Sequence, residues 1–78
     1  MVPYKLIDSK EALNLLRNHI TIAEESGEYL FHYDGKDVCL YHYCDKRCFL
    51  STKTPWHRFI LYEGVKYYQT DLSKYNID

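Results

Sequence analysis

The hydrophobic pattern of the chain changes its period at Gly27, and this change limits the folds that the sequence can adopt. Before Gly27, apolar residues recur with the spacing of an amphipathic helix. After it, apolar and polar residues largely alternate, which is typical of half-buried strands. The sequence therefore predicts an α+β fold, with one N-terminal amphipathic helix packed on a four- to five-stranded antiparallel meander sheet.

The helix is expected to cover residues 9–25. Asp8 and Glu11 have the spacing of a capping pair, in which Asp8 is the N-cap and Glu11 is the third helical residue. Apolar side chains form an arc of about half the circumference, which suits a helix that lies flat on a sheet. Gly27 is expected to end the helix. His19 falls in the middle of the apolar arc, where we expect a core histidine bonded to a backbone carbonyl or a tyrosine hydroxyl.

The remaining residues predict short strands joined by tight turns. The expected strands are residues 1–7, 28–33, 38–43, 49–53, 57–62 and 65–70. Asp34-Gly35 and Glu63-Gly64 are typical of hairpin turns, and residues 44–48 are expected to form a further turn. Pro3 suits the start of an edge strand, and the polar tail at 71–78 is expected to fray.

Length and charge exclude several classes of protein. With 78 residues and no repeat or linker, the chain is expected to form a single domain, with antiparallel hairpins over residues 28–70. Its net charge of -1 excludes a strongly basic nucleic-acid binder and an acidic disordered tail. No apolar run approaches the roughly 18 residues that span a bilayer, and no signal-peptide pattern is present. Three cysteines, an odd number, indicate reduced thiols, so we expect a cytoplasmic protein that does not associate with membranes.

Aromatic residues carry the strongest indication of function. They make up 17% of the chain, and nearly all of them follow Gly27. Both faces of the predicted sheet carry apolar residues, but one helix covers only one face, so an aromatic surface is expected to stay exposed. We expect this surface to dock onto a protein partner or a second copy of the chain. The residues expected to bind are Tyr41, Tyr43, Trp56, Tyr67 and Tyr68.

The best candidate for a metal site is the set Cys39, His42, Cys44 and Cys48, whose number suits a tetrahedral zinc ion. If residues 38–43 form a strand, however, Cys39 and His42 point to opposite faces and cannot share an ion. No signature of a catalytic cysteine surrounds any of the three thiols. We therefore predict no metal, no cofactor and no enzyme activity.

A second hypothesis concerns the basic residues between positions 46 and 58. Lys46, Arg47, Lys53 and Arg58 are interleaved with aromatic residues, a composition that suits the binding of single-stranded nucleic acid. Because the net charge is close to zero, nucleic-acid binding is the alternative and not the leading hypothesis. The leading hypothesis is a small interaction module that acts as an accessory or inhibitory protein. Proteins of this size and role are common in phages and other mobile elements.

Overall fold

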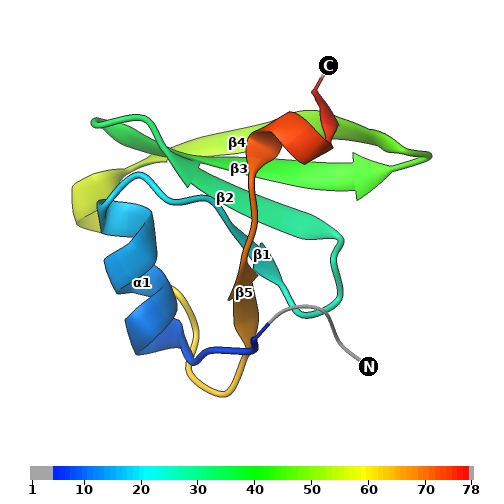
Figure 1. Cartoon of the computed structure of the whole chain (residues 1–78). Coiled ribbons are helices and arrows are strands. Elements are labelled where there is room, and N and C mark those ends of the chain that lie inside the picture. The colour runs from blue at the N-terminus through cyan, green and yellow to red at the C-terminus, as the bar shows by residue number, and fades with distance from the viewer. Residues whose placement is uncertain (1–4, 78) are drawn as a thin grey trace.

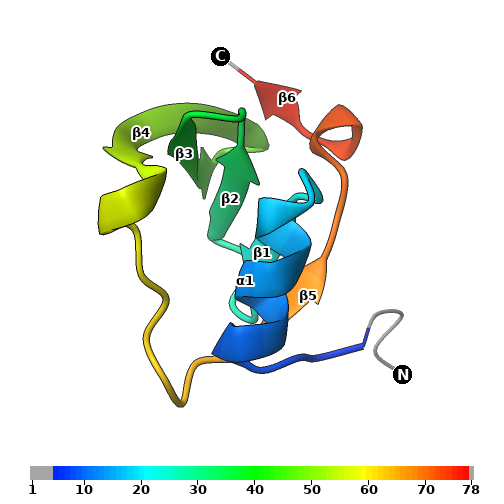
Figure 2. The ribbon, with the colours of Figure 1, turned by 90° about the vertical axis from the view of Figure 1, so that its left-hand side faces the viewer.

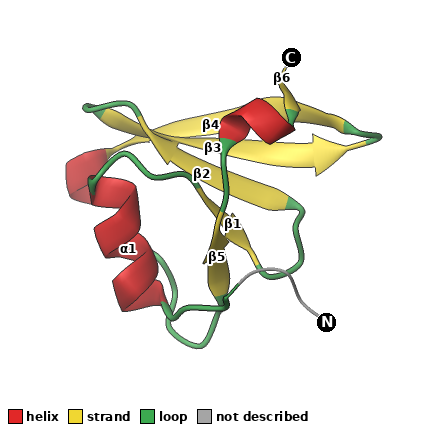
Figure 3. Ribbon diagram, in the orientation of Figure 1, coloured by secondary structure: helices red, strands yellow, loops and turns green. Residues whose placement is uncertain are grey.

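The computed structural model describes residues 5–77 and confirms the predicted α+β class (Figures 1 and 3). Its elements are α1 (Ser9–Arg17), β1 (Ile22–Glu24), β2 (Tyr29–Tyr33), β3 (Asp37–Cys44), β4 (Arg47–Pro55), the 3-10 turn η1 (Trp56–Arg58), β5 (Tyr67–Gln69), the 3-10 turn η2 (Leu72–Lys74) and β6 (Asn76–Ile77). Helix α1 packs on one curled, six-stranded sheet with the order β5-β1-β2-β3-β4-β6. Strands β2 to β4 form part of the expected meander. Strand β1, which lies within the predicted helix, pairs beside β2, β5 crosses to the β1 edge, and β6 pairs in parallel with β4.

Helix α1 begins where the sequence predicts but ends eight residues early. The Asp8 carboxylate accepts a hydrogen bond from the Glu11 N–H at 2.9 Å, as expected of an N-cap. At the other end, the N–H of His19 bonds to the carbonyl of Leu16, and that of Ile20 bonds to the carbonyl of Leu15. These two bonds form a Schellman motif, with His19 in the left-handed position at φ 63°. The prediction of a helix to residue 25 is therefore wrong, because the chain turns at His19 and continues into β1.

The early turn also moves His19 out of the core. Its ring is exposed, stacks on Tyr33 with centroids 5.0 Å apart, and places Nδ1 3.1 Å from the Tyr33 carbonyl oxygen. The expected bond to a backbone carbonyl is present, but the expected burial is not.

The two central hairpins form as predicted, and the second has a tighter turn than the sequence indicates. At the β2–β3 turn, Oδ1 of Asp34 accepts hydrogen bonds from the N–H groups of Lys36 and Asp37. Strands β3 and β4 extend to Cys44 and Arg47, which pair directly across the sheet. The two residues between them, Asp45 and Lys46, both have positive φ, as in a two-residue hairpin turn.

The predicted last hairpin is absent from the described residues. Instead, residues 57–62 lie in η1 and an irregular segment that continues to residue 66, hereafter the 59–66 loop. Strand β5 pairs with β1, so that Tyr68 lies opposite Ala23. The Trp56 ring packs against Tyr33 at 4.6 Å, which holds the chain against the sheet after Pro55 ends β4. Aromatic packing thus replaces the strand pairing that the alternating pattern suggested.

Both ends of the chain differ from the prediction. Of the expected strand at 1–7, Ile7 forms one antiparallel bridge with Tyr67, and Pro3 lies outside the described residues. The tail that was expected to fray contains η2 and β6, although Asp78 is not described. The N–H of Ser73 bonds to the Asp71 carboxylate at the start of η2, which lowers the pKa of Asp71.

The sheet has a hydrophobic core on each face. On the helix face, the buried residues are Ile7, Ala12, Leu16, Ile22, Val38 and Tyr67. On the opposite face, here called the C-terminal face, they are Ala23, Leu30, Cys48 and Tyr68. Leu72 and Tyr75 pack on this second core, so the C-terminal segment covers a face that the sequence prediction left open. Figure 1 shows that segment, in orange and red, crossing the sheet away from α1.

Candidate functional site

An apolar groove lies on the helix face, between the 59–66 loop and strands β2 and β3. Its volume is about 270 Å³. The groove is lined by Glu24, Tyr29, Phe31, Leu40, Ile60, Leu61, Tyr62, Val65 and Tyr67. Figure 2 shows the loop, in yellow and orange, descending beside the strands and α1. The groove therefore occupies part of the helix face that α1 leaves uncovered.

The 59–66 loop forms one wall because its side chains point alternately toward and away from the core. Phe59, Leu61 and Val65 are half-buried and pack against the helix-face core. Ile60 and Tyr62, which lie between them, are 65% and 71% exposed. Two large apolar side chains on a small domain are thus held at the mouth of the groove, where burial by a partner is favourable.

The floor of the groove continues across the sheet toward β4. Tyr29 stacks on His42 of the neighbouring strand, with ring centroids 5.1 Å apart. His42 pairs in turn with Phe49 of β4, which is 38% exposed. The Arg47 guanidinium lies 5.6 Å from the centroid of the Phe49 ring, within cation–π distance. Aromatic rings therefore extend the apolar surface beyond the groove to the edge of the sheet.

Glu24 is the one charged residue among those that line the groove. It pairs across the sheet with Tyr67, whose ring also lines the groove. Burial raises the pKa of the Tyr67 hydroxyl, and the nearby Glu24 carboxylate raises it further. The groove thus offers one negative charge within a largely apolar surface.

The structure places the five aromatic residues expected to bind a partner mainly in the two cores. Tyr67 and Tyr68 are only 2% and 9% exposed, so the prediction that they form an open surface is wrong. Tyr41 and Tyr43 are half-buried against the core of the C-terminal face, and Trp56 is half-buried against that of the helix face. Of the five, Tyr67 alone lines the groove.

The residues that do form the groove carried a partial signal in the sequence. Alternation correctly places Tyr29 and Phe31 on one face, and Leu40 lies on that same face because it pairs with Phe31. The sequence does not single out Ile60 and Tyr62, because its alternating pattern predicts a strand at residues 57–62. Their role depends on the irregular path of the 59–66 loop, which no local pattern indicates.

The four basic residues of the nucleic-acid hypothesis do not gather at one place. Lys46 and Arg47 lie at the β3–β4 turn, whereas Lys53 lies near the other end of β4 and Arg58 lies in η1. Arg47 and Lys53 are six residues apart, which corresponds to roughly 20 Å along a strand. Arg47 lies beside Phe49 on the helix face, but Lys53 pairs with Cys39 on the C-terminal face. All four side chains are exposed.

The four residues considered for zinc are also divided between the faces. Cys39 and Cys48 are buried on the C-terminal face, whereas His42 stacks on Tyr29 on the helix face. Within residues 5–77, no group of three or more His, Cys, Asp or Glu side chains is arranged to hold a metal ion. Burial raises the pKa of both the Cys39 and the Cys48 thiol, which disfavours the reactive thiolate.

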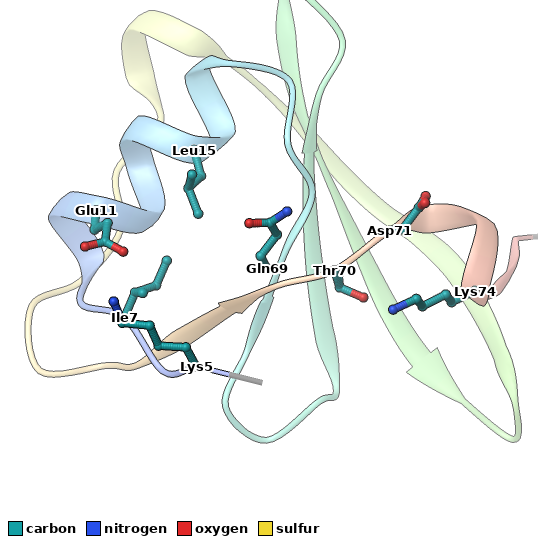
Figure 4. A pocket seen from close by; sticks show the side chains of 8 residues that line it. All are labelled: Lys5, Ile7, Glu11, Leu15, Gln69, Thr70, Asp71 and Lys74. Carbon is teal, nitrogen blue, oxygen red and sulfur yellow. The ribbon is translucent and has the colours of Figure 1, made fainter. Parts of the chain in front are cut away.

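A second hollow, of about 460 Å³, lies between α1 and the segment after β5 (Figure 4). It is lined by Lys5, Ile7, Glu11, Leu15, Gln69, Thr70, Asp71 and Lys74. Figure 4 shows the Asp71 carboxylate pointing away from the other side chains, in keeping with its bond to Ser73. The hollow carries charges of both signs, and nothing in its geometry selects a ligand.

Comparisons with known proteins add no relative. No family model matches the sequence, and neither curated proteins nor solved structures gave a match. None of the helices in the described part of the chain has the length and apolar character needed to cross a membrane. The function is therefore inferred from the geometry and chemistry of the surface alone.

Proposed function

We propose that the protein is an interaction module that binds a segment of another protein in the helix-face groove. The observation that carries this proposal is the exposure of Ile60 and Tyr62 beside an apolar floor of Tyr29, Phe31 and Leu40. At about 270 Å³ the groove lies below the ~300–1,000 Å³ of most small-molecule pockets, so it suits a few side chains better than a whole ligand. The module acts as an accessory or inhibitory protein and not as an enzyme.

The lining of the groove defines the chemistry of the partner segment. Its apolar walls favour large aliphatic or aromatic side chains, which supply most of the energy at protein interfaces. Glu24 favours a lysine or arginine on the same segment, because an unpaired charge is costly when an interface excludes water. The three free thiols support a reducing compartment such as the cytoplasm.

Selection from a random peptide library displayed on phage tests the proposal. We expect the selected peptides to combine large apolar residues with a lysine or arginine. Ile60→Ser should weaken their binding by about tenfold or more, because it removes an apolar contact at the mouth of the groove. Ile77→Ser is the matched control, since Ile77 is also exposed but lies in β6, away from the groove.

Three results would contradict the proposal. The first is a selection that yields no enriched sequence, and the second is a set of peptides that bind the wild type and Ile60→Ser equally well. The third is self-association, measured by light scattering, that Ile60→Ser abolishes, because the groove would then bind a second copy. A Glu24→Lys variant should further reverse the preference for basic peptides while keeping the apolar one.

A further inference from the structure

Among residues 5–77, the outer edge of β4 has a partner strand at only one end. Strand β6 pairs with β4 only at Arg47 and Cys48. Within residues 5–77, no other strand lies beside the outer edge of β4 from Phe49 to Pro55. Figure 2 shows β6 as a short arrow beside one end of the long, curved β4. Unpaired N–H and C=O groups along such an edge are a template for another strand.

Exposed apolar side chains flank this edge on both faces of the sheet. Phe49 and Leu50 are 38% and 45% exposed. They are adjacent in β4, so they point to opposite faces, and Ser51, Thr52 and Lys53 after them are exposed as well. A strand added at Phe49–Lys53 would cover apolar surface on both faces while it formed backbone hydrogen bonds.

The positive charge near this edge determines which kind of strand can be added. From Phe49 to Pro55 the one charged residue is Lys53, and Lys46 and Arg47 add two positive charges at the end of β4 where β6 pairs. Two copies paired through β4 would bring these like charges together, which is the usual effect of lysine on an edge strand. An acidic strand would instead gain attraction, although Asp34 lies close enough to Lys53 to offset part of its charge.

A bulge further restricts what can pair here. The β3–β4 register shifts between Leu40 and Tyr41, which leaves Ser51 as an extra residue in β4. The bulge bends the strand and limits the regular edge to a few residues on either side, which disfavours open-ended pairing between copies. A short segment of a partner can pair on both sides of Ser51 where it bends with the bulge.

We propose that the β4 edge at Phe49–Lys53 accepts a short, extended and acidic segment of another protein as an added strand. This site is separate from the helix-face groove, and it explains the basic residues of β4 without a nucleic acid.

The probe is a synthetic peptide of alternating glutamate and valine, added at millimolar concentration to the isotope-labelled protein and followed by amide NMR. We expect shifts at Phe49–Lys53 and slower hydrogen exchange of the outward-facing amides there. Two control peptides separate the contribution of charge to binding from that of backbone hydrogen bonds. One has lysine in place of glutamate, and the other is N-methylated at alternate residues so that it cannot complete the backbone pairing. Each should bind at least about tenfold more weakly.

Variants make the test specific to the edge. Lys53→Glu should weaken binding of the acidic peptide, whereas Lys66→Glu, at an exposed lysine outside β4, should not. Ile60→Ser should leave this binding unchanged, so failure of the groove proposal and failure of this one are distinguishable.

The proposal is overturned if the acidic peptide causes no shift at Phe49–Lys53, or if the N-methylated or lysine peptide binds as well. Protection of these amides that rises with protein concentration alone would assign the edge to a second copy. Binding of single-stranded oligothymidylate at these residues, in place of the peptide, would support the nucleic-acid alternative.

Discussion

The two faces of the sheet are covered by different means, and the apolar groove lies on only one of them. On the C-terminal face, Leu72 and Tyr75 pack over Leu30, Cys48 and Tyr68. On the helix face, α1 and the 59–66 loop share the cover and leave a groove between the loop and the strands. The C-terminal segment thus packs over one face, whereas a groove stays open on the other. The open face is therefore the better candidate for a functional surface.

The length of α1 explains why the helix face stays open. Nine residues at about 1.5 Å each give a helix roughly 14 Å long, whereas the Cα atoms of the protein extend 31 Å along the longest axis. The residues expected to prolong this helix form β1 instead. The sheet thus gains a strand, while the helix that covers it is about two turns shorter than predicted. The 59–66 loop covers only part of the surface that the shorter helix leaves open.

The largest contrast is expected between two leucines on opposite faces. Leu30 is fully buried in the C-terminal-face core, whereas Leu40 is half-buried on the floor of the groove. Leu30→Ala should lower the free energy of unfolding by about 2–5 kcal/mol, because it leaves a cavity. Leu40→Ala should cost less than about 1 kcal/mol. Urea unfolding followed by circular dichroism measures both, and equal losses would mean that the groove is closed in solution.

Two tyrosines on opposite faces of the sheet should differ in the same way. Tyr75 contacts the Tyr43 ring edge-on at 5.9 Å and accepts a hydrogen bond from the Thr70 hydroxyl, whereas Tyr62 is largely exposed. Tyr75→Ala should therefore cost about 1–2 kcal/mol of stability, and Tyr62→Ala less than about 0.5 kcal/mol. For binding of a selected peptide in the groove, Tyr62→Ala should cause the larger loss of affinity and Tyr75→Ala the smaller one. A Tyr75→Ala variant as stable as the wild type in thermal unfolding would show that the C-terminal segment does not close its face.

The smallest effect on stability is expected at Asp34, in the β2–β3 turn. Backbone N–H groups of Asp37 and Lys36 lower the pKa of the Asp34 carboxyl, so the folded state favours its ionised form. The resulting stabilisation is present above the unfolded pKa of about 3.9 and is lost as the pH falls through the lower folded value. Asp34→Asn should remove this part of the acid dependence without changing the binding of a selected peptide in the helix-face groove. If the free energy of unfolding of Asp34→Asn depends on pH as that of the wild type does, this prediction is contradicted.

Local signals in the sequence account for the elements that were predicted correctly. The Asp8 and Glu11 pair sets the start of α1, and Asp34-Gly35 sets the β2–β3 turn. The end of α1 was missed because a histidine, and not a glycine, occupies the left-handed position. The β-branched run Ile20-Thr21-Ile22, which favours a strand over a helix, was the signal available for β1.

The residues of the site were harder to predict because they depend on pairing between distant segments. Tyr67 and Tyr68 are buried because β5 crosses the molecule to pair with β1. Ile60 and Tyr62 are exposed because Trp56 holds the preceding turn against Tyr33 and the chain then forms no strand. Alternation of apolar and polar residues is the same in a local hairpin and in a strand that pairs with a distant segment. It therefore could not predict which of these side chains are buried.

Methyl NMR with a selected peptide tests most directly whether the helix-face groove is the docking surface. The protein is labelled at its isoleucine, leucine and valine methyl groups and titrated with the peptide. We predict that the methyl signals of Leu40, Ile60 and Val65 shift on binding while those of Leu30 and Leu72 do not. Shifts confined to Leu30 and Leu72 would place the binding surface on the C-terminal face and would contradict the account.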